Sequence, residues 1–191
     1  MFEGFLVSTG IVAIAEIGDK TQLLTIALAI RYRKAFPLIA GITAATLANH
    51  ALAAALGHHV SNLFNEHALL WILGISFLAM AAWTLIPDSL NDSPSNLNQY
   101  GPFITSFVAF FIAEMADKTQ IATVMLAAQF SDFLPVLAGT TLGMLIANVP
   151  VIFISNYAAD RLPLKLIRSL ASLGFLLLGL YSILQAISWT T

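Results

Sequence analysis

The octapeptide AEIGDKTQ at residues 15–22 recurs as AEMADKTQ at residues 113–120. At a shift of 98 residues the match continues without a gap, and 14 of the 30 positions from 14 to 43 are identical to their counterparts. The chain therefore contains an internal duplication. Each copy places two acids and a lysine inside an apolar stretch, so these two segments decide how the rest of the sequence is interpreted.

The composition is that of a membrane protein. Of the 191 residues, 59% are hydrophobic and 9% are charged, whereas soluble domains average about 45–50% apolar and about 25% charged residues. Ten acids and eight bases cannot cover the surface of a soluble fold of this size. The net charge of −2 also excludes a basic surface for nucleic acid. Without cysteine, the chain has neither disulfides nor thiolate metal ligands.

Six apolar stretches are long enough to cross a bilayer, which takes roughly 20 residues per helix. They cover residues 4–30, 35–57, 67–87, 101–129, 133–155 and 168–189. The predicted fold class is an all-α integral membrane protein with six transmembrane helices. A polar linker at 88–100 separates a first three-helix repeat (1–87) from a second (101–191). Because three is odd, the second repeat enters the membrane from the opposite side, which makes an inverted-topology repeat.

The distribution of basic residues predicts the orientation. Six of them fall in loops or span ends on one side of the membrane: Arg31, Arg33, Lys34, Arg161, Lys165 and Arg168. The loops between spans 2 and 3 and between spans 4 and 5, together with the C-terminus, carry no lysine or arginine. By the positive-inside rule, the basic side is cytoplasmic and both termini are extracytoplasmic.

The charged residues of spans 1 and 4 fall near mid-membrane, where each costs roughly 2.5–3.5 kcal/mol if it is unpaired. On continuous helices, the acids and lysine of each span would form one polar stripe. We predict that four acids from the two stripes bind a divalent cation: Glu16, Asp19, Glu114 and Asp117. Lys20 and Lys118 would balance charge without touching metal, since an ammonium has no lone pair. The alternative is a structural network in which Glu16 and Lys20, and their repeat counterparts, neutralise each other.

Further oxygen ligands could come from neighbouring side chains: Gln22, Gln120, Thr21, Thr119, Asn49 and Asn148. An all-oxygen shell favours Mg²⁺, Ca²⁺ or Mn²⁺ over Cu⁺ and Zn²⁺. His50 in span 2 is predicted to be packed and hydrogen-bonded rather than a ligand. Three histidines of the predicted outer loop are expected to be solvated, with metal capture or pH sensing as the alternative: His58, His59 and His67. Gly18 is predicted to allow close helix approach.

The paired motifs also resemble a known family. Two E-x-G-D-K-T motifs, one opening each repeat, resemble those of the Golgi manganese/calcium transporters and their bacterial manganese-exporter relatives. EIGDKT at 16–21 fits fully, whereas EMADKT at 114–119 has Ala116 in place of glycine. The resemblance implies cation/proton antiport in the bacterial inner membrane, with Mn²⁺ or Ca²⁺ as transported substrate and no resident cofactor. It also implies that the four motif acids are the functional residues.

The hypothesis that follows is a secondary transporter that exports Mn²⁺ from the cytoplasm in exchange for protons by alternating access. Crowded carboxylates cannot all remain ionised without the metal, so protons would replace its charge. A Ca²⁺/H⁺ antiporter is the alternative, and a divalent cation channel is a more distant one. An enzyme is not expected, because H-E-x-x-H and Ser–His or Ser–Lys arrangements are absent. The expected partners are a divalent cation, protons and the lipid bilayer.

Overall fold

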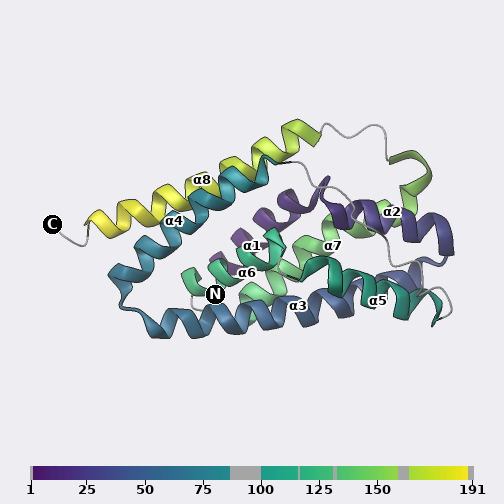
Figure 1. Cartoon of the computed structure of the whole chain (residues 1–191), viewed down its shortest axis with the longest axis horizontal. Coiled ribbons are helices and arrows are strands. Elements are labelled where there is room, and N and C mark those ends of the chain that lie inside the picture. The colour runs from purple at the N-terminus through teal and green to yellow at the C-terminus, as the bar shows by residue number, and fades with distance from the viewer. Residues whose placement is uncertain (1, 87–99, 116, 131–132, 159–163, 189–191) are drawn as a thin grey trace.

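A computed structural model describes residues 2–86, 100–115, 117–130, 133–158 and 164–188, and these residues form helices without strands (Figure 1). The described helices are α1 (Phe2–Glu16), α2 (Lys20–Tyr32), α3 (Ala35–Leu63), α4 (Glu66–Thr84), α5 (Gly101–Glu114), α6 (Lys118–Phe130), α7 (Phe133–Ala158) and α8 (Leu164–Ser188). The prediction of an all-helical chain is thus confirmed for the described part.

Four of the described helices are long and apolar enough to cross a membrane. They are α3, α4, the Phe133–Ile154 part of α7 and the Ser169–Ser188 part of α8. The predicted spans 2, 3, 5 and 6 fall on these helices. The predicted linker lies outside the described residues except for Tyr100, as do Arg161 and the C-terminal Thr191.

The other two predicted spans are not continuous helices. In the first, α1 ends at Glu16 and α2 begins at Lys20. Gly18 between them has a φ of 81°, a left-handed conformation that glycine adopts without steric cost. Asp19 follows in an extended conformation, with φ −81° and ψ 169°. The predicted polar stripe on one continuous helix is therefore wrong, and Gly18 makes a turn.

The second motif is also interrupted between two helices. Helix α5 ends at Glu114, Met115 is extended with φ −65° and ψ 120°, and α6 begins at Lys118. Each motif thus connects two half-helices, α1 with α2 and α5 with α6 (Figure 1). The acids stand at helix ends, where backbone groups without an intrahelical partner are concentrated.

Equivalent helices of the two halves make equivalent contacts. Helix α3 packs along α5, and α7 packs along α1. A Cβ added to Gly41 of α3 would lie 2.5 Å from the carbonyl oxygen of Phe103, and one added to Gly139 of α7 would lie 2.5 Å from that of Phe5. Gly139 corresponds to Gly41, and Phe103 corresponds to Phe5, at the 98-residue shift. The two contacts are therefore equivalent. Glycine is required at both positions because the backbones approach so closely.

Two apolar cores flank the helix breaks. The first lies where α4 and α8 meet α1 and α6, and it contains the stacked rings of Phe77 and Phe175 with centroids 6.4 Å apart. The second lies among α2, α3, α5 and α7, around the buried Phe110. Because α1 contributes Val12 to the first core and α2 contributes Leu24 to the second, the intervening break lies between the cores.

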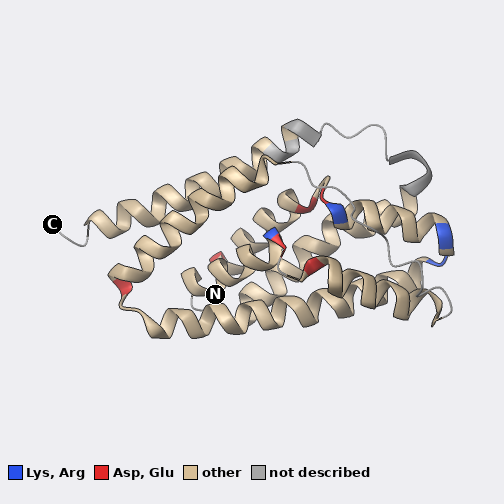
Figure 2. Ribbon diagram, viewed as in Figure 1, with Lys and Arg blue, Asp and Glu red and all other residues tan. Residues whose placement is uncertain are grey.

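The two ends of the molecule differ in their basic residues. Figure 2 shows the basic junction between α2 and α3 at one end, and the junction between α3 and α4 at the opposite end. The first junction carries Arg31, Arg33 and Lys34, whereas the second carries Glu66 and no lysine or arginine. The side chains of Lys165 and Arg168 are not among those the structure describes.

Candidate cation site at the paired helix breaks

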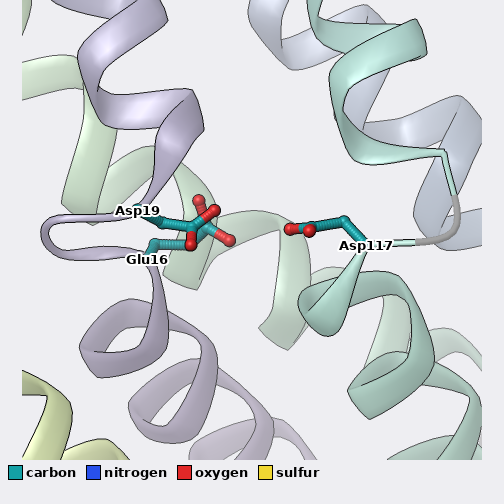
Figure 3. Close-up of side chains that lie close together, drawn as sticks. All are labelled: Glu16, Asp19 and Asp117. Atoms are coloured by element: carbon teal, nitrogen blue, oxygen red, sulfur yellow. The ribbon is translucent and has the colours of Figure 1, made fainter. Parts of the chain in front are cut away.

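The two helix breaks bring acids of both halves together (Figure 3). Glu16 ends α1, Asp19 precedes α2, and Asp117 reaches toward them from the start of α6. One carboxylate oxygen of each residue lies within 4.8 Å of the corresponding oxygens of the other two. The three residues are 0%, 6% and 4% exposed, respectively. Three buried carboxylates at this spacing repel one another unless a cation or protons reduce their charge.

The fourth predicted acid, Glu114, stands beside this group but is not part of it. Glu114 is fully buried, and neither of its carboxylate oxygens has a hydrogen-bond partner among the described residues. It is nevertheless close enough to be repelled electrostatically by Glu16, Asp19 and Asp117. The structure thus gathers three of the four acids and places the fourth within electrostatic range.

The Glu16 carboxylate connects the two motifs. The Thr21 hydroxyl donates a hydrogen bond of 2.6 Å to one of its oxygens, and the Thr119 hydroxyl donates to the other. Thr21 belongs to the first half and Thr119 to the second, and both are buried. Hydrogen bonds from both halves therefore stabilise the ionised form of this one carboxylate.

Both motif lysines contact groups outside their own motif. Lys20 Nζ lies 2.7 Å from Asp117 Oδ1, so its ion pair joins the halves. This finding contradicts the alternative in which Lys20 neutralises Glu16 on the same span. Lys118 Nζ donates to the carbonyl oxygen of Ile86 at 3.2 Å and lies over the Trp83 ring, 6.0 Å from its centroid. The Lys118 side chain thus reaches the C-terminal end of α4.

Two of the predicted amide residues connect the first break to α7. Gln22 accepts a hydrogen bond of 2.8 Å from the Gly18 N–H and donates one of 3.1 Å to the carbonyl oxygen of Ala147. Asn148 Oδ1 accepts a hydrogen bond of 2.8 Å from Thr25, and its side chain lies beside Glu16. These bonds fix the turn at Gly18 against the neighbouring helix.

The remaining predicted shell residues lie near the second break. Asn49 of α3 donates a hydrogen bond of 3.0 Å to the carbonyl oxygen of Phe111, and its own side-chain oxygen is buried without a partner in the described residues. Gln120 is partly buried on the first turn of α6.

The half-helices contribute an electrostatic component of their own. Helices α1 and α5 end at Glu16 and Glu114, so the negative ends of their dipoles lie at the breaks. The carbonyl-rich end of a helix favours a cation, as does an adjacent carboxylate. Discontinuous helices that pair such ends are a recurrent way of binding ions inside transporters. The positive N-terminal ends of α2 and α6 lie at the same breaks and oppose this contribution. The attraction for a cation, or for protons when no cation is bound, therefore comes mainly from the buried carboxylates.

Histidine at the site differs from the prediction. His50 is fully buried, and neither ring nitrogen has a hydrogen-bond partner in the described residues, so the predicted hydrogen-bonded histidine is wrong. His58 and His59 are exposed near the end of α3, as expected for solvated residues. The predicted loop location is wrong for the three outer histidines, because His58 and His59 lie within α3 and His67 lies in the first turn of α4. His67 is partly buried, and its Nε2 is buried without a hydrogen-bond partner in the described residues, so His67 is not solvated as predicted. None of these three is part of the acid cluster found among the described residues.

Comparison with known proteins identifies the family. The model of the divalent cation/proton antiporter GDT1 family matches residues 4–92 and, separately, residues 102–190. The chain belongs to the GDT1 family. Members of this family are divalent cation/proton antiporters, so the chain is a membrane transporter and not an enzyme.

Several GDT1 relatives match along most of the chain. A Vibrio cholerae protein named "Putative manganese exporter" is 56% identical over 175 residues, which cover 91% of this chain and 87% of that protein. GDT1-like protein sll0615 of Synechocystis is 28% identical over 95% of this chain and 97% of its own length. GDT1-like protein 5 of Arabidopsis thaliana is 25% identical over 98% of both chains. No solved structure matches the chain.

Proposed function

We propose that this chain exports Mn²⁺ from the cytoplasm in exchange for protons by alternating access. The observation that carries the proposal is the convergence of Glu16 and Asp19 with Asp117, with carboxylate oxygens within 4.8 Å of one another. The family supports cation/proton exchange, and the name of the Vibrio relative supports manganese and the direction of transport. The bacterial inner membrane is the proposed location.

In this proposal the four motif acids are the metal ligands: Glu16, Asp19, Glu114 and Asp117. The hydroxyls of Thr21 and Thr119, already directed at Glu16, are placed to complete an oxygen shell. Lys20 holds Asp117 in position and reduces the net charge of the site. When the metal leaves, repulsion among the buried carboxylates favours proton binding. Metal and protons thus compete for the same oxygens, which is the basis of exchange.

The proposed architecture consists of six spans in two inverted repeats, residues 1–87 and 101–191, joined by the linker at 88–100. In this architecture α1 and α2 together cross the membrane once, and α5 and α6 together cross it in the opposite direction. The two helix pairs run in opposite directions along the molecule, which supports this arrangement (Figure 1). The separate family matches to residues 4–92 and 102–190 support the duplication. The equivalent contacts at Gly41 and Gly139 support an equivalent packing of the two halves. Rocking of one half against the other would then expose the site alternately.

A Ca²⁺/H⁺ antiporter is the second candidate, because all three clustered side chains offer oxygen, which Ca²⁺ requires. An open channel is less compatible with the site. The Lys20–Asp117 ion pair bridges the halves at the acid cluster, and such a pair must rearrange for an ion to pass. A carrier rearranges its site once in each transport cycle, whereas an open channel keeps a continuous path, so the ion pair favours a carrier.

Vesicles that contain only the purified protein provide the test. We expect Mn²⁺ added outside to enter while protons leave, reported by a metal-sensitive dye and a pH-sensitive dye on the two sides of the membrane. Mn²⁺ entry without proton movement would contradict exchange. Faster exchange with Ca²⁺ than with Mn²⁺ would favour the second candidate. Protein-free vesicles are the control for leakage.

The orientation has a separate test, because the chain lacks cysteine. A single cysteine at Asn62 or Thr191 is expected to react with a membrane-impermeant maleimide from outside intact cells. A cysteine at Ser93, in the predicted cytoplasmic linker, is expected to react only after the membrane is opened. Labelling of the Thr191 variant from the cytoplasmic side alone would contradict the proposed topology.

A further inference from the structure

Helix α3 runs beside α5 and α6 in the same direction, and this arrangement fixes the level of His50. Asn49 donates its hydrogen bond to the carbonyl oxygen of Phe111. Farther along α3, a Cβ added to Gly57 would lie 2.1 Å from the carbonyl oxygen of Val124. Helix α3 and the consecutive helices α5 and α6 therefore run parallel to each other. His50, which follows Asn49 directly, lies between these two levels, as does the second helix break.

The face of α3 that carries His50 is also fixed. His50 and Gly57 are seven residues apart, which is close to two helical turns, so they share a face. That face meets α6, because Gly57 packs against Val124 and Ala127. Two turns before Val124 in the α6 chain is Asp117, whose carbonyl oxygen accepts the first-turn hydrogen bond from Ile121 N–H. The His50 side of α3 therefore faces the start of α6, at the second break.

Two buried polar groups at this level lack protein partners in the described residues. Neither ring nitrogen of His50 is hydrogen-bonded, and neither carboxylate oxygen of Glu114 is. Both residues are 0% exposed. A buried polar group without a partner is costly, and exceptions to full pairing are found at functional sites. The proposed oxygen shell gives no role to the imidazole.

The internal duplication gives an independent indication of what His50 does. At the 98-residue shift, His50 of α3 corresponds to Asn148 of α7. Asn148 lies beside Glu16 at the first break and accepts a hydrogen bond from Thr25. The equivalent positions therefore place an amide oxygen near the first break and an imidazole near the second, so the two halves offer different donor atoms.

We propose that His50 supplies a nitrogen ligand to the transported cation, alongside Glu114, and thereby favours Mn²⁺ over Ca²⁺. Imidazole nitrogen is a ligand for first-row transition metals, whereas Ca²⁺ and Mg²⁺ are bound by oxygen. An oxygen-only cluster of three acids from both breaks and an imidazole nitrogen at the second break together give the site its preference. This inference rests on cation transport by the same site and adds the residue that sets its selectivity.

Substitution of His50 by asparagine, the residue at the equivalent position of the second half, tests the proposal. The variant keeps a polar side chain but offers amide oxygen in place of imidazole nitrogen. We expect the ratio of Mn²⁺ to Ca²⁺ transport rates in vesicles to fall about tenfold, a differential barrier of about 1.4 kcal/mol. Thr46→Val is the matched control, because Thr46 is buried one turn earlier on the same face and its hydroxyl also lacks a partner in the described residues. An unchanged ratio in His50→Asn would overturn the proposal.

A spectroscopic measurement keeps the test valid if the variant does not fold. Mn²⁺ bound to the purified unmodified protein should show electron spin-echo modulation from a directly coordinated imidazole nitrogen. His50→Asn should lose that modulation, and Thr46→Val should retain it. A protein that transports Mn²⁺ but shows no nitrogen coupling refutes the role of His50 alone. A protein that transports no divalent cation refutes the proposed function instead.

Discussion

Asp117→Asn is expected to lower the exchange of Mn²⁺ for protons by about a hundredfold or more, a loss of at least about 2.7 kcal/mol in transport barrier. Asparagine keeps the shape of aspartate but removes a negative charge, a titrating group and a metal ligand. It also removes the ion-pair partner that lies 2.7 Å from Lys20 Nζ, leaving a partly buried ammonium beside a weaker site. Asp19→Asn should have a comparable effect, because Asp19 belongs to the same cluster. Both variants are measured in vesicles with the metal and proton dyes together.

The matched control for these variants is Glu3→Gln, which removes one acid from the exposed first turn of α1, far along the helix from the break. It should exchange Mn²⁺ for protons at the unmodified rate. If both aspartate variants also exchange at that rate, the carboxylates do not couple the two fluxes. A variant that still transports Mn²⁺ but no longer moves protons would separate binding from coupling and contradict a shared site.

Sequence alone predicted that acids of the two repeats meet, because burial in a membrane leaves charged groups few options. Glu16 and Asp117 are 101 positions apart, yet the duplication and the cost of an unpaired acid required them to meet. The structure brings them together with Asp19. Spacing and physical cost predicted that four acids converge, and three of them do so in the described residues. The position of Glu114 beside the cluster depends on the helix packing, which the sequence does not reveal.

The local geometry of the motifs was not predictable in the same way. The apolar periodicity on both sides of Gly18 is helical, and nothing in it shows that the helix stops for three residues. The glycine followed by aspartate did indicate a break. Glycine permits a left-handed turn, and aspartate is favoured at the position directly before a helix. This indication was obscured because glycine also occurs at close helix contacts, as Gly41 does here.

The surroundings of Lys118 could not be deduced from the D-K-T-Q sequence. Its ammonium donates to the carbonyl oxygen of Ile86 and lies over the Trp83 ring. Trp83 lies in the last turn of α4 and Ile86 just beyond the end of that helix, so these contacts come from tertiary packing that the local sequence does not reveal.

Gly41→Ala is expected to destabilise the folded protein by about 1–3 kcal/mol, the usual range for overpacking a tight contact. The added Cβ would lie 2.0 Å from Ser106 Oγ, which can move, but also 2.5 Å from the carbonyl oxygen of Phe103, which is held in α5. At roughly 2–4 °C per kcal/mol for a chain of this size, the Tm of the purified protein should fall by about 2–12 °C.

Gly10→Ala is the control, because a Cβ there meets nothing within 4 Å, and alanine is about 1 kcal/mol better than glycine inside a helix. Its Tm should equal or exceed that of the unmodified protein. Equal Tm values for Gly41→Ala and the unmodified protein would contradict the close packing of α3 on α5, and with it the level at which His50 meets the second break.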